Sequence, residues 1–122
     1  MRRAGRKRPA LFIDDAKMPS APAHEFLKTH SISGRTSSRL VKLLIQSLCE
    51  DGWIGAAIAV VRIGSEMYIL DGHHRTVAAR HAKIDVSYRL VEIDELSSFG
   101  YSSLEQVVHA HAEAGVNRLN LR

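Results

Sequence analysis

Residues Tyr68 to Arg80 constrain the fold of this 122-residue chain more than any other stretch. A short apolar run that ends at Leu70 predicts a buried strand, the Asp71-Gly72 pair predicts a tight turn, and the following residues predict a helix. The first N–H groups of such a helix have no intrahelical acceptor, and the positive end of the helix dipole lies behind them. This strand, turn and helix therefore predict an anion site at the turn.

The side chains at this turn suit phosphate. Gly72 lets the backbone come close to a ligand because it has no Cβ, and Arg75 can donate a forked pair of charge-assisted hydrogen bonds. Asp71 or one of the two histidines can act as an acid or base, since histidine titrates near neutral pH. The alternative is structural: Asp71 caps the helix, Gly72 shapes the turn, and the histidines are ordinary surface residues. The predicted phosphate-binding residues of the turn and helix are Gly72, His73, His74, Arg75 and Thr76.

The sequence Asp71-Gly72-His73-His74-Arg75, followed by Ala78-Ala79, a short helix and another strand, resembles the central motif of the ParB/sulfiredoxin superfamily. The resemblance extends from about Arg35 to Ile93, which is roughly half of the chain. It implies an α+β fold in which a small mixed β-sheet is flanked by helices. It also implies that this turn holds the phosphate of a nucleotide or nucleic acid, although a shared fold does not fix the reaction.

Members of this superfamily differ at the positions around His73. Sulfiredoxins have a catalytic cysteine where this chain has His73, which argues against sulfiredoxin activity. ParB partition proteins carry a box of the Gly-Glu-Arg-Arg type for the triphosphate of CTP, and its second acidic and basic positions are absent here. The Asp-Gly-His-His-Arg form is more similar to the free serine kinases and to ParB-like nucleases and ATPases. In the serine kinases a glutamate before the first long helix acts as a base, and Glu25 lies in a roughly comparable place.

The favoured function is a nuclease or nucleotide hydrolase, which makes an enzyme the preferred interpretation over a binding module. We expect the ligand to be a nucleoside triphosphate or diphosphate, with Mg²⁺ held mainly by its phosphates. The alternatives are a nucleotide-dependent kinase of a small hydroxyl compound, a non-catalytic nucleotide-switched DNA-binding module, and the effector end of a larger protein. Arg75 would stabilise the charge that develops at phosphorus. The expected catalytic residues are Asp71, His73, His74 and Arg75.

The basic residues are unevenly distributed along the chain. Five of the 17 lie before Pro9, which leaves 12 against 13 acidic residues in the remainder. We therefore predict a basic arm over residues 1–9 and a single domain over residues 10–122. Such an arm can bind DNA or RNA because basic side chains release counterions from phosphates, and a solvated leader is an equally good interpretation. The five residues are Arg2, Arg3, Arg6, Lys7 and Arg8.

The chain has a single cysteine, Cys49, which excludes an internal disulfide and a multi-cysteine metal site. We expect Cys49 to pack as a small apolar residue and the protein to be cytoplasmic. No apolar stretch is long enough to span a membrane, and the first residues lack the apolar region of a signal peptide. A membrane partner is therefore not expected, and the sequence leaves the oligomeric state open.

The period of four leucines predicts a helix over Arg35–Asp51, with Thr36 or Ser37 at its N-cap. Arg35 and Arg39 lie near its start, on the side where superfamily members bring basic residues toward the phosphates. We therefore count both as possible phosphate ligands, with a solvated helix face as the alternative. The leucines that set the period are Leu40, Leu43, Leu44 and Leu48.

The other elements complete an expected order of strand, helix, hairpin, helix, strand, helix. Apolar runs at 56–63 and 67–70 predict the hairpin, and its second strand leads into the Asp71 turn. Further strands are expected at 10–13 and 85–93, and a last helix at 102–114. Before the long helix we expect a loop through Pro19 and Pro22 and a helical turn near 24–27.

Overall fold

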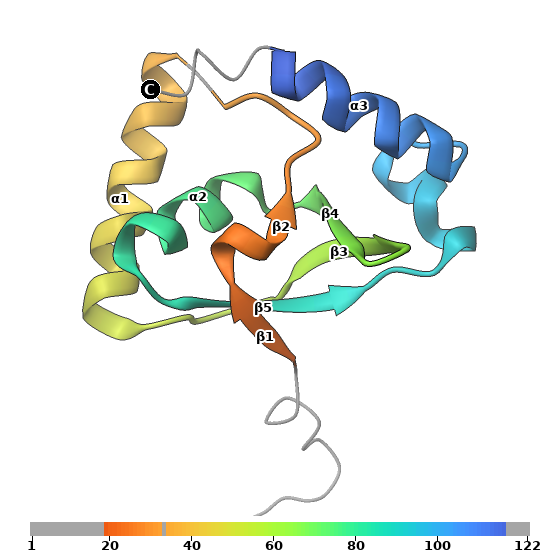
Figure 1. The fold of residues 1–122 in the computed structure, drawn as a ribbon. Coiled ribbons are helices and arrows are strands. Elements are labelled where there is room, and N and C mark those ends of the chain that lie inside the picture. Colours follow the sequence, from red (N-terminus) through yellow and green to blue (C-terminus); the bar gives the residue numbers. More distant parts are fainter. Residues whose placement is uncertain (1–18, 33, 117–122) are drawn as a thin grey trace, which may run out of the picture.

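Residues 19–32 and 34–116 are described by a computed structural model. They form a five-stranded sheet with the strand order β1-β5-β3-β4-β2, and helices pack on both of its faces (Figure 1). Parallel and antiparallel strand pairs both occur in it. The predicted α+β fold with a small mixed sheet is therefore confirmed. The expected strand at 10–13 and the basic arm at 1–9 lie outside the described residues.

Three strands form the centre of the sheet. β3 (Ile58–Ile63) and β4 (Glu66–Asp71) are the predicted antiparallel hairpin, and β5 (Asp85–Leu90) pairs with β3 in parallel. Successive side chains of a strand point to opposite faces, so Val60 lies on one face of β3 and Val61 on the other. Both are buried because the sheet is covered on both sides.

Two helices, α1 (Arg35–Asp51) and α2 (His73–Ala82), cover one face of the sheet (Figure 1). The helix predicted over Arg35–Asp51 is confirmed, and α2 is the predicted helix of the motif. Ala78 and Ala79 of α2 are completely buried, which lets α2 lie close to the sheet. The residues of α1 that pack on this core are Val41, Leu44, Ile45 and Leu48.

The apolar face predicted for α1 is wrong in part. Leu40 and Leu43 are 41% and 65% exposed. Val41 and Ile45 point inward instead. The buried face of α1 is therefore rotated by part of a turn from the face predicted from the leucines alone. The expectation that Cys49 packs as an apolar residue is also wrong, because this side chain is exposed.

The other face of the sheet packs against a 3₁₀-helix, η3 (Ile93–Phe99), and against α3 (Leu104–Val116). Leu96 and Val107 are 2% and 0% exposed in this second core. The last predicted helix is thus confirmed, and it buries Val107 while Val108 is 40% exposed. None of the helices in residues 19–32 and 34–116 is both long and apolar enough to span a membrane.

The strand predicted at 85–93 ends early. β5 stops at Leu90, although the Val91 N–H still donates to the carbonyl of Val60 at 2.7 Å. Glu92 and Glu95 then form a capping box, in which each side chain bonds the backbone N–H of the other, and this box starts η3. The alternation of apolar residues that predicts a strand continues to residue 93, but the two glutamates start a helix there instead.

The segment before α1 differs from the prediction. Ser20–Pro22 forms an edge strand, β1, antiparallel to β5, where a loop was expected. An edge strand tolerates proline because no neighbour requires the missing N–H on its outer side. The helical turn expected near 24–27 is η2 (Ala23–Glu25), and Phe26–Leu27 then forms β2, which pairs in parallel with β4.

Candidate functional site

The turn between β4 and α2 depends on Gly72. Its φ of 109° and ψ of 24° lie in the left-handed region, where a residue with a Cβ is strained. A Cβ at this position would also lie 2.7 Å from the Cβ of Ile58 and closer still to its Cγ2. The turn can therefore pack directly against β3 because Gly72 has no side chain. This is a structural role in addition to the predicted role of letting a ligand come close.

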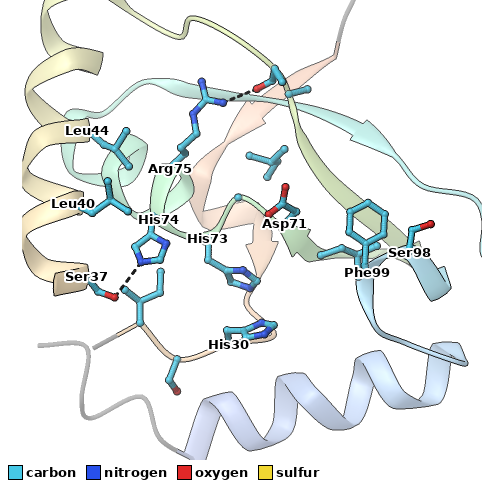
Figure 2. Close-up of a pocket in the computed structure, with 17 residues that line it drawn as sticks. His30, Ser37, Leu40, Leu44, Asp71, His73, His74, Arg75, Ser98 and Phe99 are labelled. Atoms are coloured by element: carbon cyan, nitrogen blue, oxygen red, sulfur yellow. Dashed lines mark hydrogen bonds between the residues drawn. The ribbon is translucent and has the colours of Figure 1, made fainter. Parts of the chain in front are cut away.

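A cavity of about 710 Å³ lies at this turn (Figure 2). Its volume is within the range of small-molecule sites, about 300–1,000 Å³. The cavity is lined by parts of α1, β3, β4, α2 and η3 and by the loop before α1. We call it the motif cavity, because the structure brings five predicted residues together there. These are Asp71, Gly72, His73, His74 and Arg75.

Two helices have their first turns at the motif cavity. The N-caps of α1 and α2 are Gly34 and Gly72, neither helix has a side-chain cap, and neither has an acidic residue in its first turn. The N-terminal N–H groups are therefore not satisfied by caps, and no carboxylate in either first turn offsets the positive end of the dipole. Neither Thr36 nor Ser37 caps α1 as expected. Asp71 does not cap α2, which argues against the structural alternative for this residue.

His73 is buried, and its hydrogen bonds fix the position of its proton. Its Nε2 accepts the N–H of Thr29 at 3.0 Å, so in the neutral ring this nitrogen carries no proton. Thr29 Oγ1 in turn donates to the carbonyl of Ile69 at 2.6 Å. His73 is therefore held as the tautomer with its proton on Nδ1.

Burial is the main cause that lowers the pKa of His73 from 6.5 to about 4, and the positive charges of His30, His74 and Lys28 add to it. His73 is consequently uncharged at neutral pH. It can donate a hydrogen bond from Nδ1, but it cannot supply the acid or base that was expected to titrate near neutrality.

His74 links the two helices. Its Nε2 lies 3.1 Å from Ser37 Oγ, across the gap between α2 and α1 (Figure 2). Its Nδ1 makes no hydrogen bond with another residue of the described ranges, so this nitrogen is available to a ligand. The side chain is half-buried and lines the motif cavity.

Arg75 makes structural contacts with the loop between α1 and β3. Its Nη1 donates to the carbonyl of Ala56 at 2.7 Å, and its Nη2 donates to the carbonyl of Ile54. The guanidinium carbon lies 4.0 Å from the centre of the Trp53 ring. Figure 2 shows Arg75 pointing toward this loop, away from the end of the cavity where His30 lies. Burial lowers the pKa of Arg75, but a guanidinium stays charged at neutral pH.

Asp71 is the only carboxylate among the described residues that line the motif cavity. It is exposed at the end of β4, where it pairs with Ala59 of β3, and its carboxylate makes no hydrogen bond or ion pair with another described residue. Mg²⁺ is commonly bound by one or two carboxylates together with the phosphates of a nucleotide, and Asp71 has this ligand type. Within residues 19–32 and 34–116, no group of three or more His, Cys, Asp or Glu side chains could hold a metal ion by itself.

Four predicted residues do not line the motif cavity: Thr76, Glu25, Arg35 and Arg39. The Thr76 hydroxyl donates to the carbonyl of Gly72 at 2.9 Å. Glu25 is exposed in η2. Arg35 and Arg39 are exposed on α1, and because a helix turns by roughly 100° per residue, both lie on the side of α1 opposite Ser37.

Several residues of the site were missed by sequence reasoning. The His30 ring lies edge-on to the His73 ring, with ring centres 4.9 Å apart, and Ser98 and Phe99 approach from η3 (Figure 2). Thr29, which orients His73, precedes it by 44 positions. No local pattern connects segments so far apart, so only the fold reveals these neighbours.

No protein-family model and no curated protein matches the sequence. The structure is similar to a crystal structure of the C-terminally truncated chromosome-partitioning protein ParB from Caulobacter crescentus complexed with CTP-gamma-S, with a TM-score of 0.54 and 23% sequence identity. The match covers 74% of this chain and 52% of that chain, so this chain spans about half the length of the similar structure. The chain therefore has the ParB/sulfiredoxin fold that its motif predicts.

Proposed function

We propose that this chain is a nucleotide-binding domain whose motif cavity holds a nucleoside triphosphate, with the phosphates against the start of α2. One observation carries the proposal: the N-terminus of α2 has no side-chain cap and no acidic residue in its first turn, and it lies at a cavity of about 710 Å³. Such a helix start is a natural phosphate site. The similarity to a ParB structure complexed with CTP-gamma-S supports the same ligand class.

The side chains around this helix start suit phosphate oxygens. His73 can donate from Nδ1 without carrying a charge, and His74 can donate from the ring nitrogen that does not bond Ser37. Arg75 has more N–H groups than its loop contacts use, so it can contribute a charge-assisted hydrogen bond. The dipoles of α1 and α2 supply further positive potential.

We further propose that the bound nucleotide is hydrolysed with Asp71 as the base. Its carboxylate is exposed in the motif cavity and has no partner among the described residues, whereas the unprotonated nitrogen of His73, Nε2, already accepts the N–H of Thr29. Asp71 would take the proton of a water whose oxygen bonds to the terminal phosphorus, while the bond from that phosphorus to the bridging oxygen breaks and the nucleoside diphosphate leaves. Mg²⁺, if bound with the phosphates, would neutralise part of their charge.

The test is nucleotide binding and turnover with Mg²⁺, across ATP, ADP, GTP and CTP, with plasmid DNA and RNA as parallel substrates. We expect Asp71→Asn to keep nucleotide affinity and to lose at least about a hundredfold in turnover. Glu25→Gln is the matched control, because it removes a carboxylate outside the cavity. Full turnover by Asp71→Asn would contradict the role of Asp71, and no binding of any nucleotide would contradict the proposed function. Strand cleavage lost in Asp71→Asn would instead assign a nuclease.

A nucleotide-switched module is the second candidate, and the contacts of Arg75 favour it. A phosphate that draws Arg75 toward the cavity would weaken its hold on the loop at Ile54 and Ala56. Nucleotide binding would then change the conformation of the loop between α1 and β3. Nucleotide binding without turnover in the unmodified chain would select this candidate over the hydrolase.

A further inference from the structure

A second cavity, of about 320 Å³, lies beside the motif cavity. The two cavities share the lining residues His30, Ile32 and His73, so they meet at the pair of histidine rings whose centres are 4.9 Å apart. We call the second one the histidine cavity. The histidines that line it are His24, His30, His73 and His111.

The lining of the histidine cavity is basic. In addition to its histidines it contains Lys28 and Arg80, and no Asp or Glu is among the described residues that line it. The remaining lining residues are apolar, apart from Thr76. Cationic side chains that have no carboxylate beside them in a cavity attract anions. The volume is near the lower limit for small-molecule sites, about 300 Å³, so the cavity suits a small molecule rather than a nucleotide.

His111 is held in a fixed orientation at the wall of this cavity. Its Nδ1 donates to the carbonyl of Lys28 at 2.9 Å, and its ring packs edge-on against Tyr68 with centres 5.6 Å apart. A carbonyl can only accept, so Nδ1 carries the proton, and Nε2 of the neutral ring can accept a hydrogen bond from an O–H of a ligand. The bond joins α3 to the segment after β2, and it positions a polar group before any ligand arrives.

We propose that the histidine cavity binds a small molecule with an anionic group, a phosphate or a carboxylate. Arg80 and Lys28 supply positive charge for the anionic group, and Nε2 of His111 supplies an oriented acceptor for an O–H of the same molecule. The wall formed by His30 and His73 separates this anion from the motif cavity. The histidine cavity would bind the anion whether or not a nucleotide fills its neighbour.

The test uses NMR of the histidine rings in the full chain. Inorganic phosphate, glycerol 3-phosphate and glycerate are titrated separately, with glycerol as the neutral control. His111 lines the histidine cavity and not the motif cavity, and His74 lines the motif cavity and not the histidine cavity, so their signals distinguish the two sites. We expect a saturable shift of the His111 signal with at least one anion and none with glycerol. A response to glycerate alone would identify a carboxylate ligand, and a response to the phosphates alone a phosphate ligand.

Two variants and one control make the assignment specific. Arg80→Gln removes a positive charge from the cavity lining, and Lys42→Gln removes one from an exposed position of α1 that lines neither cavity. We expect the Kd read at His111 to rise about tenfold in Arg80→Gln and to stay unchanged in Lys42→Gln. His111→Asn keeps an amide N–H for the Lys28 carbonyl but lacks Nε2, and calorimetry should show a similar loss of affinity.

Three outcomes would overturn the proposal. The first is the lack of a saturable His111 shift with all three anions. The second is a shift of the His74 signal alone, which would place the anion in the motif cavity. The third is an equal loss of affinity in Arg80→Gln and Lys42→Gln, which would show that the anion responds to the net charge of the protein and not to this cavity.

Discussion

At the scale of single residues, Gly72 meets two separate requirements, a left-handed backbone and contact with Ile58. We expect Gly72→Ala to lower the free energy of unfolding by roughly 2–6 kcal/mol, the sum of backbone strain and overpacking. Gly64→Ala is the matched control, because Gly64 also has a positive φ, 64°, but a Cβ there would meet nothing within 4 Å. Urea denaturation should show the larger loss for Gly72→Ala. In an Ile58→Ala background the cost of Gly72→Ala should shrink, and an unchanged cost would show that Ile58 is not the obstacle.

His73 makes stability depend on pH. Its pKa is about 4 in the folded chain and 6.5 in its ordinary state, so between these values the unfolded chain binds more protons. The free energy of unfolding should therefore rise with pH across this window, and the contribution of His73 should be complete above it. The difference between the two pKa values corresponds to about 3 kcal/mol.

The measurement for His73 is denaturation from pH 4 to pH 8 in the unmodified chain and in His73→Gln, whose Oε1 can still accept the Thr29 N–H. Because both chains have the same carboxylates, the difference between their pH profiles isolates His73. We expect the variant to lose most of the rise between the two pKa values. Parallel profiles would contradict the lowered pKa.

The environment of each motif residue is not visible in the sequence. His73 and His74 are adjacent and chemically identical, yet one is buried against Thr29 and the other bridges to Ser37. The sequence does identify the motif, because glycine, histidine and arginine at a helix start are a local pattern. Burial and partners depend on residues elsewhere in the chain, so the roles of the two histidines could not be told apart.

At the scale of elements, the side chain of Arg75 connects α2 to the loop between α1 and β3 through two hydrogen bonds and a cation–π contact. The loop contains Trp53, the single tryptophan of the chain, so intrinsic fluorescence reports on it directly. We expect Arg75→Ala to change the emission of Trp53 and to lower the free energy of unfolding by about 1–3 kcal/mol, because it removes hydrogen bonds and a cation–π contact. Arg80→Ala, an exposed arginine of the same helix, is the control. Unchanged emission and stability in Arg75→Ala would mean that the loop does not depend on this contact.

The elements were predicted best where local chemistry decides them. The helices α1 and α2 and the β3–β4 hairpin follow from periodicity and turn residues. β1 was missed because prolines at 19 and 22 indicate a loop, and only its pairing with β5 makes it a strand. The end of β5 was misplaced because the Glu92 and Glu95 capping box starts a helix within an apolar alternation.

At the scale of the whole molecule, the fold brings the first turns of α1 and α2 to one cavity, although they lie far apart in the chain. The loop before α1, the start of β3 and the end of η3 complete its wall. The family resemblance predicted this architecture, since the motif is part of it. The composition of the cavity could not be predicted, because it is assembled from five segments whose contact depends on sheet order.

Nucleotide binding should stabilise the whole fold, because a ligand that binds only the folded chain shifts the unfolding equilibrium. At a nucleotide concentration a hundred times the Kd, the gain should be about 2.7 kcal/mol. Thermal denaturation with CTP, ATP and GTP would measure this gain and rank the nucleotides. His74→Ala should reduce it, and it should lower the Tm without ligand by only about 5 °C, since the side chain is half-buried and the variant loses one hydrogen bond, that to Ser37. An equal gain in the unmodified chain and in His74→Ala would show that His74 does not contact the nucleotide.

A titration of nucleotide and Mg²⁺ into ¹⁵N-labelled protein, followed by the backbone amide signals, tests the proposed phosphate site at the start of α2. The proposed site has phosphates on the N–H groups of the first turn of α2. The largest saturable shifts should therefore be those of His73, His74 and Arg75, with smaller ones in the first turn of α1. Saturable shifts that leave these three amides unchanged, or no saturable shifts with any nucleotide, would contradict the account.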